Sequence, residues 1–555
     1  MQAGFAFMEA GAVRSKNTVN ILIKNLLDML IGGIAYWLIG FPLAFGSEGN
    51  FFLSYSYWAN YQLPSEKYGH WFFDFVHAAT ASTLVSGSMA ERCNFYAYLL
   101  YSFLITGFIY PVASHWAWHP KGWLKVTAFK DYAGGCVVHM LGGMCALVGA
   151  ALMGPRIGRF HKKTGEAHDI RGHSVPLAAL GGFILLFGFL AFNAGFRGHI
   201  SHPGDGEVIS RAIVNALLGA CGGGVGALVI HRAGTFGPTH AWSFLMTLNG
   251  ALAGLVGVCA GSDVFPSWAA LVVGVGAGFT FLCLHFLLLK LKVDDPLDAF
   301  PVHFGGGFFG IVAVAFFMED GIIFNPSRNS ALRLLGLNPA ANSALVKWFP
   351  GLTNFTRPDI DIPWIAIDAP RLRKWVKASP DVDTSRVLGW NLAGAAAISG
   401  WSATLCLILF GILKKFGILR VDKEMEIRGM DVIKHNEPAY PSTAWEDCDP
   451  GQYGTSTMAT KIFSMMSSTK RTEEGLDRSS RMQGPFAGRQ MSRTASSNLF
   501  NGYSPNTITT CSTLHSSNDP DSRAQVSCND GIVPRSNSDS SGLQNRDDIT
   551  AVSHI

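Results

Sequence analysis

Two histidines lie in matched apolar settings and are the first candidates for chemistry. His139 and His303 each follow a valine, and glycines occupy the third and fourth positions after each of them. Asp131 and Asp295 precede them by eight residues. Imidazole nitrogens can pass hydrogen bonds and protons. One buried histidine is usually structural, whereas two at matched positions indicate a shared path through the protein.

Long apolar helices must position these histidines. Only 15% of the 555 residues are charged, against about 25% in soluble proteins. Apolar blocks approach the about 20 residues that cross a bilayer, among them 31–45, 99–112, 176–192 and 269–289. The sequence therefore predicts an all-α polytopic membrane protein in a lipid bilayer. A net charge of +4 is too small to indicate a nucleic-acid partner.

The apolar blocks predict about eleven transmembrane helices. Only about 13 apolar residues precede Arg14, too few to span a bilayer, so we expect a truncated first helix. His139 and His303 fall on the fifth and tenth helices, which run in opposite senses. This arrangement predicts a five-plus-five inverted repeat with both histidines at the membrane midplane.

The residues around each histidine suggest how the path is built. The glycines that follow allow helices to approach closely, and a buried imidazole pair is expected to be neutral or to share one proton. Asp131 should cap the N-terminus of its helix. Asp295 and Asp298 could do the same or attract cations at the inner mouth. Neither histidine has a second ligand three or four residues later, so no metal and no cofactor is expected.

Two aromatic residues could act on an incoming cation, one by attracting it and the other by gating its path. Trp118 ends the fourth helix, where an indole belongs at the membrane interface and could also attract a small cation by about 0.5–2 kcal/mol. Phe192 near the end of the sixth helix could form a steric, dewetting gate.

Loop charges predict the orientation. Most short basic loops alternate onto one side, which predicts an outside N-terminus and a cytoplasmic C-terminus. The chain divides into a transmembrane domain (1–421), a cytosolic regulatory helix region (422–441) and a disordered Ser/Thr-rich tail (442–555). Three residues are candidate modification sites: Asn354 for glycosylation, and Ser492 and Ser496 for phosphorylation.

These motifs together resemble the ammonium transporter family. The resemblance covers about residues 1 to 441 and rests on eight stretches in family order: 1–6, 13–20, 86–92, 131–143, 192–195, 249–256, 294–307 and 426–435.

The resemblance implies a plasma-membrane homotrimer with one pore per subunit and ammonium or ammonia as substrate, with methylammonium as an analogue. It implies that His139 and His303 are the pore histidines and that Trp118 and Asp131 recruit the cation outside. Phe192 belongs to the gate. The chain is then a transporter and not an enzyme.

Three departures from the family pattern concern the vestibule and the regulatory helix. His77 stands where the family usually has the other gate phenylalanine, and Phe196 where a serine often helps to bind the ion. Phe73 or Phe75 could fill the gate instead. In the regulatory helix, Ile433 replaces the phosphorylatable threonine of plant relatives.

Two alternatives stay open on the sequence. The protein could be an ammonium sensor whose tail signals, or a Rh-type channel for ammonia and carbon dioxide, although the match at 426–435 disfavours the latter.

Overall fold

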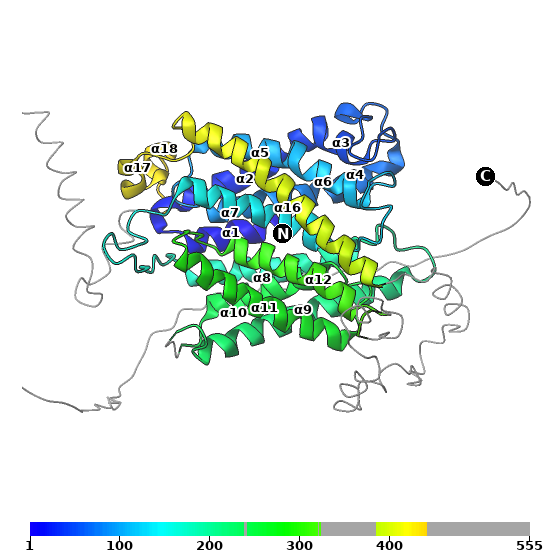
Figure 1. The fold of residues 1–555 in the computed structure, drawn as a ribbon. Helices are drawn as coiled ribbons and strands as arrows, with labels where there is room; N and C mark the ends of the chain where they lie inside the picture. Colours follow the sequence, from blue (N-terminus) through cyan, green and yellow to red (C-terminus); the bar gives the residue numbers. More distant parts are fainter. Residues whose placement is uncertain (238–240, 320, 324–383, 441–555) are drawn as a thin grey trace, which may run out of the picture. The chain divides into compact units, whose positions relative to one another are not determined.

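The computed structural model describes residues 1–237, 241–319, 321–323 and 384–440, and these are helical with no β-strand (Figure 1). Asn354, Ser492 and Ser496 lie outside the described residues, as does the tail from residue 442.

The first half of the bundle runs from α1 to α7. Its α-helices are α1 (Gln2–Ala12), α2 (Thr18–Ala35), α3 (Phe41–Phe45), α4 (Tyr68–Ser88), α5 (Phe95–Leu104), α6 (Tyr110–Trp118) and α7 (Leu141–Met153). Three π-helical segments join them: η2 (Tyr36–Gly40), η5 (Ile105–Ile109) and η6 (Gly135–Met140).

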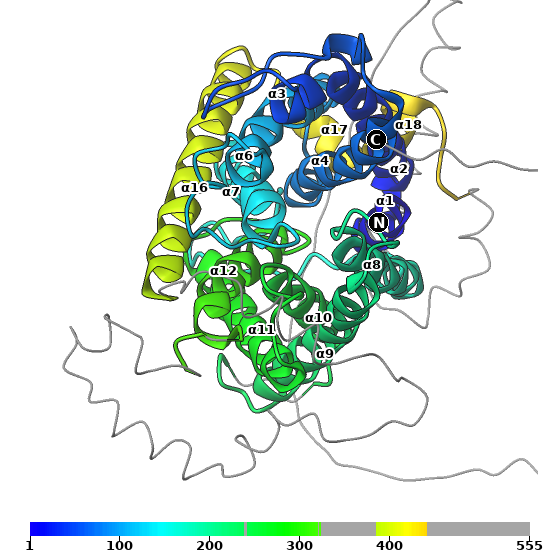
Figure 2. The ribbon, with the colours of Figure 1, turned by 90° about the vertical axis from the view of Figure 1, so that its right-hand side faces the viewer.

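The second half begins at α8 and is drawn in green in Figure 2. It contains α8 (Val175–Gly195), α9 (Asp205–Arg232), α10 (Phe244–Cys259), α11 (Ser267–Lys290), the π-helical η7 (Phe300–Gly305) and α12 (Gly306–Phe317). The long α16 (Thr384–Lys415) follows, and the short α17 (Lys423–Arg428) and α18 (Met430–His435) end the described chain.

Eight of these segments are long and apolar enough to cross a membrane, counting α2–α3, α5–α6, η6–α7 and η7–α12 as continuous. The shorter apolar α10, together with α4 and the half-length α1, completes the eleven predicted helices. Large apolar side chains face outward, for example Phe187 at 74% exposed and Phe183 at 60%. Such a surface is costly in water and favourable in lipid, so the structure supports a multi-pass membrane protein.

Glycines set the close packing of the second half. Helix α9 packs against both α10 and α11. A Cβ at Gly250 or Gly278 would lie 2.6 Å from the Gly223 carbonyl oxygen, closer than a side chain permits. Only glycine lets these backbones meet, as expected for helices that pack without a hydrophobic driving force.

Candidate functional site

The two predicted histidines meet inside the bundle. The rings of His139 and His303 are nearly parallel, with 5.2 Å between centroids and 17° between planes. Both are buried, and both lie in π-helical segments, η6 and η7. The sequence repeat is therefore matched by a repeated backbone irregularity, and π-helical turns are frequent at functional sites.

The trailing glycines bring the two segments together. A Cβ at Gly143 would lie 2.5 Å from the Phe304 nitrogen, and a Cβ at Gly307 would lie 2.2 Å from the Gly135 carbonyl oxygen. The glycine four residues after each histidine thus contacts the segment that carries the other histidine. The expectation that these glycines permit close approach is confirmed.

The histidine nitrogens are largely without protein partners. Both ring nitrogens of His139 and Nδ1 of His303 are buried and make no hydrogen bond to the described residues. Phe189 stacks on His139 at 5.2 Å, and Phe5 lies 6.2 Å from His303. Buried polar atoms normally have partners, so these nitrogens are available to a small hydrogen-bonding molecule held between apolar walls.

The predicted gate residues lie next to this pair. The ring centroid of Phe192 is 4.2 Å from that of His77 and 5.5 Å from that of His139. We call His77 and Phe192 the aromatic gate. His77 is fully buried.

The hydrogen bond of His77 defines its tautomer. Its Nδ1 lies 2.7 Å from the Phe73 carbonyl oxygen, while its Nε2 is buried without a described partner. A carbonyl only accepts, so Nδ1 must carry the proton. In the neutral ring, Nε2 is then left as an acceptor inside the gate.

Phe73, Phe196 and Trp118 cluster beside the aromatic gate, and we call these three rings the vestibule. Phe196 lies 4.7 Å from Trp118, 5.9 Å from Phe73 and 5.7 Å from His77 between ring centroids. Trp118 is 6.3 Å from His77. Phe75, the other residue considered for the gate, packs against Trp71 and Tyr36.

Asp131 lies behind this vestibule and caps η6. Its Oδ2 accepts hydrogen bonds from the backbone nitrogens of Cys136 and Val137, both at 2.9 Å. Its backbone carbonyl accepts from Trp118 Nε1 at 3.0 Å, and its Oδ1 is buried without a described partner. Burial raises the pKa of Asp131 to about 6 despite these bonds.

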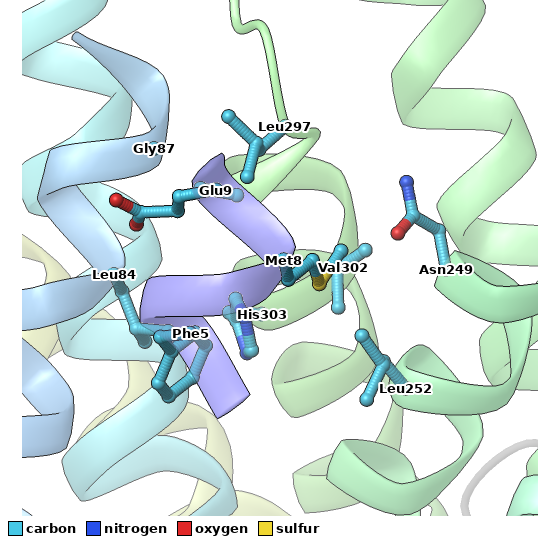
Figure 3. Close-up of a pocket in the computed structure, with 11 residues that line it drawn as sticks. Phe5, Met8, Glu9, Leu84, Gly87, Asn249, Leu252, Leu297, Val302 and His303 are labelled. Carbon is cyan, nitrogen blue, oxygen red and sulfur yellow. The ribbon is translucent and has the colours of Figure 1, made fainter. Parts of the chain in front are cut away.

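A small cavity lies at the other side of His303 (Figure 3). Its volume of about 20 Å³ has room for roughly one water-sized molecule. Glu9 of α1 lines it and accepts hydrogen bonds from Ser86 and from Asn25 Nδ2, the latter at 2.7 Å. Sequence reasoning missed Glu9, although an acid among the apolar residues of a membrane helix is itself a signal.

Asp295 and Asp298 lie near this cavity with different partners. Asp295 Oδ2 caps η7 by accepting from the Phe300 nitrogen at 2.8 Å. Desolvation and the neighbouring Asp298 raise the pKa of Asp295 to about 7. Asp298 accepts hydrogen bonds from His285 Nδ1 at 2.6 Å and from Asn249 Nδ2 at 3.1 Å.

A buried ion network, which sequence reasoning also missed, closes this end of the bundle. Arg156 bonds Glu91 at 3.0 Å and Asp294 at 2.8 Å, and Arg14 bonds Glu91 at 2.9 Å. Burial alone would raise the pKa of Asp294, but its bonds to Arg156 lower it to about 2. We call Arg14, Glu91, Arg156 and Asp294 the ionic end.

The predicted regulatory helix docks on this ionic end as two short helices. Gly429 separates α17 from α18 with a positive φ of 99°, and a Cβ there would lie 2.6 Å from Lys16. Glu426 accepts from the Ile157 nitrogen at 2.7 Å, and Asp431 accepts from the Asn20 nitrogen at 2.9 Å. The region therefore contacts both the start of α2 and the loop after α7.

Comparison with known proteins identifies the family. The profile of the Ammonium Transporter Family matches residues 1–356 and 362–440. A putative ammonium transporter 1 of Caenorhabditis elegans is 41% identical over 459 residues, covering 80% of this chain and 77% of its own. Ammonium transporter 1 member 1 of Arabidopsis thaliana is 34% identical over 450 residues, covering 78% and 80%.

Solved structures agree with these relatives. A Sensor Amt Protein is 29% identical with a TM-score of 0.63, covering 78% of this chain and 94% of its own. Mep2 of Saccharomyces cerevisiae, at 24% identity and a TM-score of 0.57, covers 76% and 84% and shows the same fold. The chain belongs to the ammonium transporter family.

Proposed function

We propose that this chain moves ammonium by binding NH4+ at the vestibule, removing one proton, and passing NH3 along His139 and His303. The observation that carries the proposal is the continuous series of rings from Trp118 through the aromatic gate to the paired histidines. The named transporters among its relatives favour transport over the sensor alternative.

The vestibule has the chemistry for a small cation. The Trp118 indole can attract a cation through its ring face, and Asp131 adds a buried carboxylate whose Oδ1 is unpartnered. An ion held by a ring and a carboxylate can still leave, because neither strips its whole hydration shell.

The gate and the histidine pair favour a neutral species. The aromatic gate buries two rings with centroids 4.2 Å apart directly beside His139. Removing a bare ion from water costs tens of kcal/mol by Born estimates, whereas NH3 requires only hydrogen bonds. The unpartnered nitrogens of His139 and His303 provide them.

We further propose that the vestibule end is extracellular, that the ionic end is cytoplasmic, and that the protein forms a homotrimer in the plasma membrane. The loop charges support this orientation. Native mass spectrometry of the detergent-solubilised protein measures the subunit number directly.

Uptake of labelled methylammonium by purified protein in liposomes tests the proposal. Saturable uptake that empty liposomes lack supports transport, and its absence would favour the sensor alternative. Carbon dioxide flux in the same liposomes tests the Rh-type alternative.

A further inference from the structure

Three side chains of types that bind metal ions, two imidazoles and one carboxylate, lie close together in the turn between α8 and α9. His199, His202 and Asp205 follow one another at intervals of three residues. His199 Nδ1 lies 2.6 Å from Asp205 Oδ2 and 3.0 Å from His202 Nδ1, and His202 Nδ1 lies 3.5 Å from the same carboxylate oxygen. Among the described residues, these three form the one such group of three or more histidine, cysteine or acidic ligands.

In the absence of a metal, one proton can hold these atoms together. If His199 Nδ1 carries the proton, it donates to Asp205 Oδ2 and can share the proton with the lone pair of His202 Nδ1. If His202 Nδ1 donates to His199 instead, the His199 lone pair faces a carboxylate oxygen 2.6 Å away. A metal cation can take the place of the proton, because all three atoms can act as electron-pair donors toward it.

The turn holds the carboxylate in place for this role. Asp205 is buried at the first position of α9, after Gly204 with a φ of 92°. Arg197 Nε bonds its Oδ1 at 2.8 Å, and the His202 backbone nitrogen bonds its Oδ2 at 2.8 Å. These bonds fix the carboxylate plane and keep Oδ2 directed at the histidines.

The two imidazoles leave the remaining side of the group open. His199 and His202 are both exposed, so water can reach the point where the three atoms converge. Three protein ligands plus water is a common arrangement for zinc.

We propose that His199, His202 and Asp205 bind a divalent transition-metal ion of the zinc class. Metal–ligand distances of about 2.0–2.1 Å place tetrahedral ligand atoms about 3.3 Å apart. Two of the three separations, 2.6 and 3.0 Å, are shorter than this and the third is 3.5 Å, so metal binding requires the imidazoles to move slightly away from the carboxylate and from each other. Imidazole ligands select Zn²⁺, Cu²⁺ or Ni²⁺ over Mg²⁺ and Ca²⁺.

A metal ion at this site would link two parts of the structure. Phe196 of the vestibule directly precedes Arg197, and Asp205 begins α9. A bound ion ties the segment that follows the vestibule to the start of the next helix.

The test uses the full-length protein in nanodiscs after treatment with a chelator. Zn²⁺ is titrated in competition with a chromophoric chelator, and Co²⁺ is added separately to read its visible d–d bands. The variant is His199→Ala/His202→Ala. The control is His161→Ala/His168→Ala, which removes two other exposed histidines whose rings are 5.9 Å apart.

We expect the wild type and the control to bind one Zn²⁺ per chain more tightly than the variant, by more than about tenfold. Tetrahedral Co²⁺ bands should appear in the wild type and the control and vanish in the variant. Equal Zn²⁺ affinity in all three proteins, or Co²⁺ bands that persist in the variant, would overturn the proposal.

Discussion

The two sides of the histidine pair differ in chemistry. Beyond His139 the path is bounded by rings, those of His77, Phe192 and Trp118, with Asp131 behind them. Beyond His303 it meets a small cavity with Glu9 in its wall, and then the buried ionic end. In the proposed mechanism, one side selects and dehydrates a cation, whereas the other offers polar groups to a molecule that is leaving.

Removing the vestibule charge should have the largest effect on uptake. Asp131→Asn keeps the shape of the side chain but loses its charge. Across a few ångströms at an effective dielectric of about 20, a unit charge contributes on the order of 2 kcal/mol, which is about a 30-fold loss of uptake at low ammonium. Initial rates in liposomes measure it. Unchanged rates in a correctly folded variant would remove Asp131 from recruitment.

Removing the regulatory helices should have the next largest effect. Truncation before Glu426 deletes the contacts with Ile157 and with the start of α2, so we expect reduced uptake. Truncation after Tyr440 retains both helices and should leave uptake largely intact. Equal loss in the two proteins would show that the region from residue 441 is itself required.

The polar side of the pair can be tested through Glu9. Glu9→Gln keeps the volume and can still accept a hydrogen bond from Ser86, but it replaces one carboxylate oxygen in the cavity wall, the one that accepts from Asn25, with an amide nitrogen. We expect a moderate loss of uptake, smaller than that of Asp131→Asn, because in the proposed mechanism the molecule that passes this point is neutral NH3. A larger loss than in Asp131→Asn would show that the side with Glu9, rather than the vestibule side, contributes more to uptake.

The smallest effect is expected in the pH profile of His77→Phe. Two groups can suppress uptake in acid. Asp131 loses its attracting charge as the pH falls through about 6, and protonation of His77 would place a positive charge in the gate. Uptake between pH 5.5 and 8 should therefore fall in acid for the wild type, and less steeply for His77→Phe. Superimposable profiles would assign the whole effect to Asp131.

The sequence alone was sufficient to predict the structural elements that repeat along the chain. The spacing of aspartate, valine, histidine and two glycines predicted the paired helices, the caps at Asp131 and Asp295, and the close approach at Gly143 and Gly307. The eleven helices followed from apolar length, because a bilayer fixes how long each must be.

Residues that are distant in the sequence and contact each other only in the folded structure could not be predicted from local spacing. Arg156 pairs with Asp294, 138 positions away, and nothing in the local sequence of either residue indicates the other. Phe75 was a gate candidate because of its place in the chain, but the helical turn directs it away from His77. The π-helical form of η6 and η7 was likewise not predicted from the spacing of their residues.

We expect the paired histidines to make the proposed path selective for ammonium. The direct measurement is methylammonium uptake and K+ flux in liposomes containing either the wild type or His139→Ala/His303→Ala, with His161→Ala/His168→Ala as the control. The account predicts that only the His139→Ala/His303→Ala protein loses selective uptake, while circular dichroism and subunit number stay unchanged. Unchanged uptake together with unchanged discrimination against K+ in that protein would contradict it.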